Sequence, residues 1–286
     1  MPPFSSRSNV WAIARTSLGL VLHSPYLKLM PATTPRATLC ATTLRDRSVI
    51  RVGGADARAF LQGLLTQDVA GLAIGAPRYA GLLTPQGKAL FDMILWADPA
   101  GSDDVLIDCE AARVEALSRR LMLYRLRRPV TVAAEDGLAV HWSADPVDST
   151  SADPRLPALG WRWLAAAGEG DASEMFRAHR LAQGVPEGVA ELGEDKTLWL
   201  ESNAEELHGV DYGKGCYVGQ ENTARMHYRN KVNRRLVVLP LEQSDPARLR
   251  IAYPALGLAV DHRPVDSLGD VPLPAWQAAA IAANAE

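Results

Sequence analysis

The order of apolar segments after the first 47 residues constrains the fold of this chain more than any other feature. Apolar runs predict strands at 48–52, 104–110 and 128–134, and apolar residues at helical spacing predict helices at 54–69 and 112–124. Between the first helix and the second strand, "RYAGLLTPQGKALFDMILWAD" predicts a hairpin, because its proline presets one turn angle and its glycine tolerates a positive φ. The order strand, helix, hairpin, strand, helix, strand predicts an α+β fold with sheets covered by helices, rather than a doubly wound parallel sheet.

The second half of the chain continues this pattern and ends in short strands. The stretch 143–157 is polar and rich in Pro and Asp, which predicts an excursion or a linker. The segment 172–184 predicts a helix that places Met175, His179 and Leu181 near one face and ends at a glycine. After residue 235, short apolar runs separated by prolines predict a small terminal β module.

These patterns divide the chain into four segments. We predict a basic, poorly ordered extension at 1–43, an N-terminal α+β domain at 44–135, a central α+β domain at 136–235 and a short C-terminal β module at 236–286. The composition suits this division, since 286 residues with 48% hydrophobic content can bury a sizeable core.

The N-terminal extension differs in composition from the rest of the chain. It contains basic residues and many Ser and Thr, and the chain has no acidic residue before Asp46, so the extension resembles a transit peptide. We expect instead that translation starts at Met30 and that the protein is cytoplasmic and bacterial; the alternative is a genuine transit peptide, which would imply a mitochondrial location. The cysteines Cys40, Cys109 and Cys216 form no C-x-x-C pair, which argues against a disulfide framework or a zinc site and favours a reducing compartment.

One of these cysteines lies in an unusual setting, within "DYGKGCYVGQENTARMHYRNK". Gly213, Gly215 and Gly219 let the backbone turn tightly around Cys216, and the segment that follows has the polarity of an exposed helix. A place near a helix N-terminus and close to Lys214 favours the thiolate, which predicts a reactive cysteine. The alternative is that Cys216 is a small apolar side chain buried in a glycine loop.

A basic run follows this loop. Arg225, Arg229, Lys231, Arg234 and Arg235 occur with no acidic residue among them, and they could hold phosphates, an RNA backbone or a polycarboxylate, or form a solvated face. The formal net charge of the chain is -3 and few aromatic residues accompany the run, so direct nucleic-acid binding is not expected. The chain also lacks a run of apolar residues long enough to predict a membrane span.

The cysteine loop resembles a family signature. "KGCYVGQE", followed by "TAR" and "RRL", is similar to the signature of the YgfZ family, whose members are relatives of the glycine cleavage T-protein. Further resemblance is carried by "FLQGLLTQDV", "LLTPQGKALFDMILW" and "LESNAEELHGVDY", so that it covers most of residues 48–236. The residues that match the core of the signature are Lys214, Gly215, Cys216, Tyr217, Gly219, Gln220, Glu221 and Arg225.

The resemblance implies a function and a set of site residues. It implies a T-protein-like fold that binds tetrahydrofolate or a derivative and assists the maturation or repair of iron-sulfur enzymes, and through them tRNA thiomodification. The implied partners are folate and iron-sulfur client or assembly proteins, and the implied state is a monomer with no membrane contact. Cys216 and Lys214 would carry the chemistry, without a metal of their own, because one cysteine cannot ligate a cluster alone. The implied cofactor-binding residues are Asp92, Glu201, Asn203, Gln220, Glu221 and Arg225.

Each of these roles has an alternative. Asp92 could be an edge charge of the hairpin, Glu201 a surface residue and Asn203 a turn or cap residue. A carboxylate and an amide suit the donors and acceptors of a pterin ring, and Arg225 suits its glutamate tail. The competing function is that of a tetrahydrofolate-dependent aminomethyl or methyl transferase, which has no evident use for the thiol of Cys216. An RNA-binding protein would rest on the basic run alone.

Overall fold

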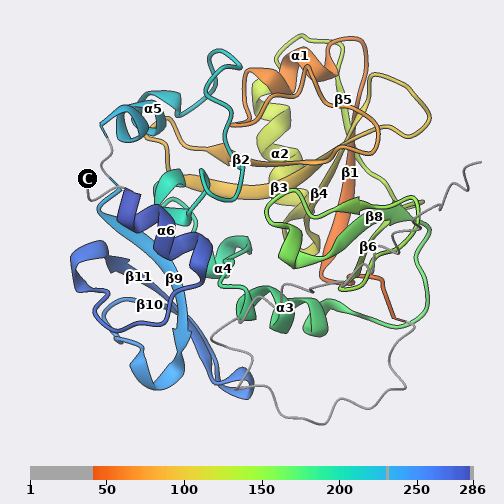
Figure 1. Ribbon diagram of the computed structural model, residues 1–286. Helices are drawn as coiled ribbons and strands as arrows, with labels where there is room; N and C mark the ends of the chain where they lie inside the picture. Colours follow the sequence, from red (N-terminus) through yellow and green to blue (C-terminus); the bar gives the residue numbers. More distant parts are fainter. Residues whose placement is uncertain (1–40, 230–231, 284–286) are drawn as a thin grey trace, which may run out of the picture.

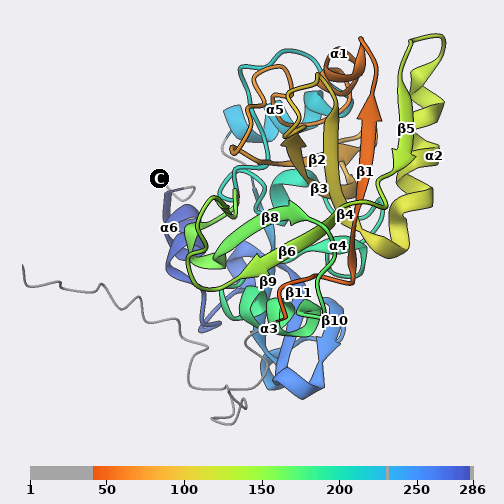
Figure 2. The same cartoon turned by 90° about the vertical axis from the view of Figure 1, so that its right-hand side faces the viewer.

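Five antiparallel strands form the largest sheet of the computed structural model, which describes residues 41–229 and 232–283. The elements of this part are β1 (Arg47–Gly53), α1 (Ala57–Gln62), β2 (Arg78–Leu83), β3 (Ala89–Ala97), β4 (Val105–Glu110), α2 (Val114–Arg125) and β5 (Thr131–Ala134). The strands lie in the order β2-β3-β4-β1-β5, and each neighbouring pair is antiparallel. The helices α1 and α2 bury Leu61, Leu117 and Leu121 in one apolar cluster with the sheet (Figure 2).

Two smaller sheets follow along the chain. The elements of the middle part are β6 (Ala139–Ser143), β7 (Ser151–Ala152), β8 (Trp161–Ala165), α3 (Ser173–Ala182), α4 (Gly188–Leu192), the 3₁₀ helix η5 (Trp199–Ser202) and α5 (Gln220–Tyr228). Those of the last part are β9 (Arg234–Pro240), β10 (Leu249–Tyr253), β11 (Leu258–Pro264) and α6 (Ala275–Ala283). The sheets have the strand orders β6-β8-β7 and β10-β11-β9, and the last one lies at the lower left of Figure 1 with α6 beside it.

A single apolar cluster joins the three sheets. It contains Ile94 of β3, Trp142 of β6, Trp199 of η5 and Val238 of β9, all at most 3% exposed. The sheets therefore share a core, and none of them buries its apolar face alone.

The α+β class, the hairpin and the short C-terminal β module are confirmed. Residues 1–40, which include Met30 and Cys40, lie outside the described part of the chain, as does Lys231. Thr43, which the sequence assigns to the N-terminal extension, is buried and forms a β-bridge with His141. None of the helices in the described residues combines the length and the apolar character that a membrane span requires.

The first helix is shorter than the sequence predicts. It ends at Gln62, because Gly63 follows and the Gln62 side-chain oxygen accepts hydrogen bonds from the amides of Val69 (2.6 Å) and Ala70 (3.1 Å). These bonds give the amides of Val69 and Ala70 a partner outside a helix, and residues 63–69 form turns and bends with a β-bridge from Leu65 to Leu82.

The buried face of α3 matches the predicted face only in part. Leu181 is buried as predicted, but Met175 is 39% exposed, and Phe176 and Arg180 are buried as well. Phe176 packs against Trp142, and Arg180 pairs with Glu191 at 2.8 Å. A buried ion pair allows an arginine on the inner face, where a hydropathy pattern cannot place it.

The polar stretch 143–157 is an ordered excursion and not a linker. It contributes β7 to the second sheet, and its side chains Asp153 and Arg155 are buried and paired at 2.7 Å. Asp153 also accepts a hydrogen bond from Arg162 of β8 at 3.2 Å, and Arg155 pairs with Glu187, so these contacts fix the stretch to the rest of the fold.

Candidate functional site

The predicted cysteine loop displays its thiol at the surface. Cys216 is exposed, Gly215 has a φ of +93°, and α5 begins four positions later at Gln220. Two hydrogen bonds hold the loop to the end of α1: the Lys214 ammonium donates to the backbone oxygen of Gln62, and the Gln62 amide donates to the Lys214 oxygen at 3.1 Å. The predicted alternative of a buried cysteine is therefore wrong, since the thiol is open to a partner.

Gly219 explains why the loop can meet the hairpin. It has a φ of +86°, and a Cβ atom added here would lie 2.5 Å from the backbone oxygen of Thr84 and 3.1 Å from Gly87 Cα. The Asn222 amide donates to the Gln86 oxygen at 2.6 Å, which fastens α5 to the same turn. The start of α5 is thus fixed by the hairpin tip, and glycine is the residue that permits the close approach.

Lys214 has an unusual environment for a lysine. Its ammonium lies 4.9 Å from the centre of the Tyr217 ring. Partial burial lowers the pKa of Lys214 to about 8, although Asp68, Asp211 and Cys216 oppose the shift. The amine next to the thiol therefore carries a proton that it can release near neutral pH.

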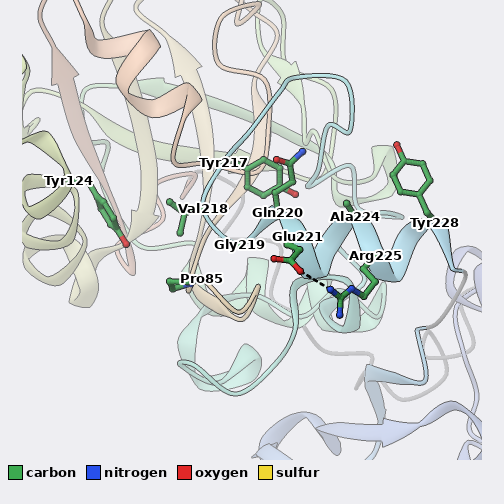
Figure 3. A pocket seen from close by; sticks show the side chains of 10 residues that line it. All are labelled: Pro85, Tyr124, Tyr217, Val218, Gly219, Gln220, Glu221, Ala224, Arg225 and Tyr228. Carbon is green, nitrogen blue, oxygen red and sulfur yellow. Dashed lines mark hydrogen bonds and ion pairs between the residues drawn. The ribbon is translucent and has the colours of Figure 1, made fainter.

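An open groove of about 730 Å³ lies along α5 and the loop. Figure 3 shows Tyr124 of α2 at one end and Tyr228 of α5 at the other. The predicted residues Gln220, Glu221 and Arg225 all line it, and Glu221 and Arg225 form an exposed ion pair at 2.7 Å. The rest of the lining comes from Pro85, Tyr217, Val218, Gly219 and Ala224.

Asp92 lies elsewhere, on β3, and is 4% exposed. Its carboxylate accepts hydrogen bonds from the Gly188 amide (3.2 Å) and the Tyr79 hydroxyl (3.4 Å). Burial, and then the charge of Glu187, raise the pKa of Asp92. Asp92 is thus an interior carboxylate and not an edge charge of the hairpin.

A buried ionic network surrounds Asp92. Asp108 pairs with both Arg47 (2.7 Å) and Arg162 (3.0 Å), and Glu187 pairs with Arg47 and Arg155. Burial opposes the ionisation of Glu187, but the arginines outweigh it and hold the pKa of Glu187 well below its usual range. The network joins strands of the first two sheets to the loop that precedes α4.

A cleft of about 460 Å³ opens beside this network, between the first sheet, α3, α4 and β10. Burial, and then Asp92, raise the pKa of Glu110 to about 6 at this cleft, where its carboxylate also accepts the Val189 amide at 2.9 Å. Among the described residues, the buried Arg180 Nε has no hydrogen-bond partner, and the buried Arg47 Nη1 has no hydrogen bond but lies 3.4 Å from Glu187 in their ion pair. The polar lining comes from Asp46, Arg47, Glu110, Arg177, Arg180, Glu187, Glu191 and Tyr253.

Glu201 and Asn203 contact the C-terminal module. Glu201 lies 3.1 Å from His262 of β11. Asn203 is fully buried with a φ of +63°, its amide donates to the Leu236 oxygen at 3.0 Å, and its oxygen accepts from Gln277 at 3.1 Å. Both polar atoms of Asn203 therefore already have partners inside the fold.

Known proteins resemble this chain over most of its described length. It is 35% identical over 240 residues to "Iron-sulfur cluster assembly factor IBA57, mitochondrial" of Mus musculus, covering 71% of this chain and 67% of the relative. It is 36% identical over 238 residues to the protein of the same name from Homo sapiens, covering 71% of this chain and 66% of the relative. The chain belongs to the IBA57 family. The predicted resemblance to YgfZ-type proteins is thereby confirmed, and this IBA57 family member spans about two thirds of the length of these relatives. No family model matches the chain.

A solved structure shows the fold of this IBA57 family member. The glycine cleavage system aminomethyltransferase T from Bartonella henselae superposes with a TM-score of 0.61 at 16% identity, covering 80% of each chain. The predicted T-protein-like fold is confirmed.

In this IBA57 family member, the predicted site residues lie in three surroundings: the groove beside the cysteine loop, the buried network, and the contact with the C-terminal module. Sequence reasoning missed Gln62, which holds the loop, and Arg47, Glu110 and Glu187, which line the cleft. The segment "RLAQGVPEG" was the available sequence signal, because it places Arg180 and Glu187 close together around a glycine turn at the end of a predicted helix. The cleft that these residues share, however, depends on contacts between segments distant in sequence.

Proposed function

We propose that this protein is a folate-binding accessory factor that assists the maturation or repair of iron-sulfur enzymes, and through them supports tRNA thiomodification. The observation that carries the proposal is the exposed Cys216 thiol, held on a glycine loop that is fastened to both α1 and the hairpin. The relatives named as iron-sulfur cluster assembly factors support it.

Cys216 acts together with a partner protein in this proposal. Iron-sulfur clusters are usually held by four ligands, and the described residues contain no group of three or more His, Cys, Asp or Glu side chains placed to hold a metal. The thiol therefore meets a cluster, or a thiol, that the iron-sulfur assembly or client protein brings. Lys214, with its pKa near 8, can take up or release the thiol proton during that exchange.

The proposed folate site is the cleft beside the ionic network. Its volume of about 460 Å³ falls within the usual range for small-molecule sites. The carboxylate of Glu110 suits the amino and ring N–H groups of a pterin, and Arg177 suits its glutamate tail. Arg180 Nε, which has no hydrogen-bond partner among the described residues, and Arg47 Nη1, which has only the 3.4 Å ion pair with Glu187, are further donors for such a ligand. When bound, a reduced folate would supply one-carbon or redox chemistry, and these residues would bind and orient it.

The predicted cofactor residues take different parts in this site. Asp92 lies behind Gly188, which lines the cleft, so we propose that Asp92 positions that backbone. Glu201 and Asn203 are proposed to fix the C-terminal module, whose Tyr253 also lines the cleft. The groove that contains Gln220, Glu221 and Arg225 is the competing folate site, and Arg225 would be the cation for the tail there.

The thiol is tested with two matched variants in a strain that lacks the protein. Cys216→Ser should abolish the activity of dependent iron-sulfur enzymes, while the melting temperature and folate binding stay unchanged. Cys109→Ser is the control, because Cys109 is buried on β4 and burial raises its pKa to about 12. Full complementation by Cys216→Ser would contradict the proposed role of the thiol.

The folate site is tested by calorimetry with tetrahydrofolate. Arg177→Glu should weaken binding by roughly tenfold or more, because the tail loses a cation, whereas Arg225→Glu should leave it unchanged. The reverse result would move the tail to the surface groove, and no heat with any reduced folate would rule out the cofactor.

The location of the protein is also a proposal. The relatives are named as mitochondrial, and the composition of residues 1–43 resembles a transit peptide. We propose mitochondrial import, with the bacterial cytoplasm as the alternative, and fractionation of cells that carry a C-terminally tagged chain distinguishes the two.

A further inference from the structure

The groove along α5 is concave, and aromatic side chains lie at both of its ends. Tyr124 comes from α2 and Tyr228 from α5, while Pro85, Val218 and Ala224 line the space between them (Figure 3). Tyr228 is 75% exposed. Exposed apolar concavities of this kind are characteristic of sites where another molecule binds.

Exposed apolar side chains concentrate around this groove. Met122, Leu123 and Leu126 flank Tyr124 in the chain and are 39%, 67% and 82% exposed. Together with Tyr228 they make up four of the eight large apolar side chains that the described residues expose. The apolar surface therefore extends from the groove over the end of α2.

The same surface carries arginines without acidic partners. Between Glu115 and Glu135 the chain has five arginines and no acidic residue. In the described part of the chain, Arg120, Arg127 and Arg128 form no ion pair. Arg120 lies one helical turn before Tyr124, so it faces the same side of α2.

The α5 side of the groove also presents positive charge. Arg225 pairs with Glu221, but both side chains are exposed, at 53% and 82%, so the pair is weak and can be exchanged. Arg229 lies one turn further and is exposed. The rim of the groove is therefore complementary to an acidic partner.

We propose that the groove between α5 and the end of α2 docks an acidic segment of a partner protein that inserts an apolar side chain. Val218 lies in the groove two positions after Cys216, so a partner seated there lies next to the thiol. This inference rests on the proposed function in one respect: it takes the partner to be an iron-sulfur assembly protein.

The shape of the surface favours a protein over other anionic partners. A bilayer presents a plane, and it cannot fill a concavity that is lined by three separate segments of the chain. A nucleic-acid backbone would meet apolar groups at the centre of the groove, where phosphate contacts require donors. Burying a tyrosine or an aliphatic side chain among arginines is the usual arrangement of a protein interface.

The test uses purified iron-sulfur scaffold and carrier proteins encoded in the same genome, labelled and titrated by fluorescence anisotropy. We expect a protein with an acidic surface to bind, and its affinity to fall by roughly tenfold between about 50 and 300 mM salt. Ala224→Glu, which fills the groove with a negative charge, and Arg120→Glu should each weaken binding by at least about tenfold.

Matched variants on the far module serve as controls. Arg248→Glu and Leu249→Glu likewise introduce a glutamate for an arginine and for an apolar residue, at side chains about 40% exposed before and on β10, and these variants should bind as the unchanged protein does. Cys216→Ser should also keep its affinity, so docking can persist even if the thiol proves dispensable for iron-sulfur enzymes. If Cys216→Ser supports iron-sulfur enzymes fully and docking is intact, the proposed function is overturned and the docking site is not.

Three results would overturn the docking site itself. They are no binding by any of the purified proteins, equal weakening by the groove and control variants, and binding to phosphatidylglycerol vesicles or to a second copy of the chain in place of an assembly protein. Circular dichroism of each variant ensures that weakened binding reflects the surface and not unfolding.

Discussion

The cleft makes ionisation of the Glu110 carboxylate unfavourable. Burial raises its pKa from the ordinary value of 4.5 to about 6, so the folded protein binds this proton more tightly than the unfolded chain does. Its contribution therefore disfavours folding increasingly as the pH rises from about 4.5 through 6. Glu110→Gln removes the charge and keeps an oxygen for the Val189 amide.

The expected result is a variant more stable than the unchanged protein by roughly 1 kcal/mol above pH 7, since solvent screens part of the effect. The difference should vanish below about pH 4.5, where both states of the chain are protonated. Urea denaturation across this pH range measures it. A variant of constant or reduced stability would mean that Glu110 is compensated by a neighbouring charge in the cleft.

Asn203 separates a folding role from a ligand role. The hydrogen bonds of its side-chain amide join η5 to β9 and α6. Its φ of +63° is one that asparagine tolerates better than alanine. Asn203→Ala should therefore lower the free energy of unfolding by about 2–4 kcal/mol, through lost hydrogen bonds and backbone strain. Thermal melts with and without tetrahydrofolate test this. A variant of normal stability that no longer binds folate would show that Asn203 contacts the ligand.

Single residues could be predicted from the sequence where their role is local. Cys216 and Gly219 lie in one short loop, so their glycine neighbours already indicate a tight turn, although the sequence left open whether the thiol is reactive or buried. The surroundings of Asp92 and Asn203 could not be predicted, because their partners Gly188 and Leu236 are distant in sequence. Charge patterns report exposure, and they fail where acids and arginines are buried together.

At the scale of elements, the hairpin tip and α5 form an interlocking contact. Gly219→Ala forces a Cβ atom to within 2.5 Å of the Thr84 oxygen and places alanine at a φ of +86°. We expect a loss of about 2 kcal/mol or more in stability, together with a displaced α5. Gly215→Ala is the control: its φ is +93°, but nothing lies within 4 Å of the added atom, so it should cost roughly 1 kcal/mol of backbone strain alone.

Urea denaturation measures both losses, and alkylation of Cys216 reports on the position of the loop. If both variants lose the same free energy of unfolding, the contact with the hairpin contributes nothing to stability, and Gly219 is needed only for its positive φ. Strands and the hairpin were predictable here because their signals are local, whereas the early end of α1 depends on the side chain of Gln62.

At the scale of the molecule, the shared core and the ionic network make the three sheets one unit. The sequence indicated segments with separate boundaries, but the apolar cluster contains side chains of all three sheets. Periodicity reveals which residues are buried without revealing against which element, so the association of the sheets could not be predicted.

A substitution in the ionic network tests whether the three sheets unfold together. Asp108 is fully buried on β4 and pairs with Arg47 of β1 and Arg162 of β8, so it connects two sheets. Asp108→Asn keeps the volume but leaves two buried guanidinium groups short of one negative charge, which should cost about 3–5 kcal/mol. Asp245→Asn is the control, since Asp245 is half exposed and lies 4.0 Å from Arg248.

Differential scanning calorimetry measures the outcome. Because the C-terminal module shares the apolar cluster, we expect one transition that shifts as a whole in Asp108→Asn, with equal calorimetric and van't Hoff enthalpies. A second transition that keeps its original temperature would show that the module from β9 to α6 unfolds on its own. In that case the cleft, which needs Tyr253 of β10 beside Glu110 of β4, could open by separation of the module. A single shifted transition instead means that a ligand must enter and leave a cleft whose walls stay together.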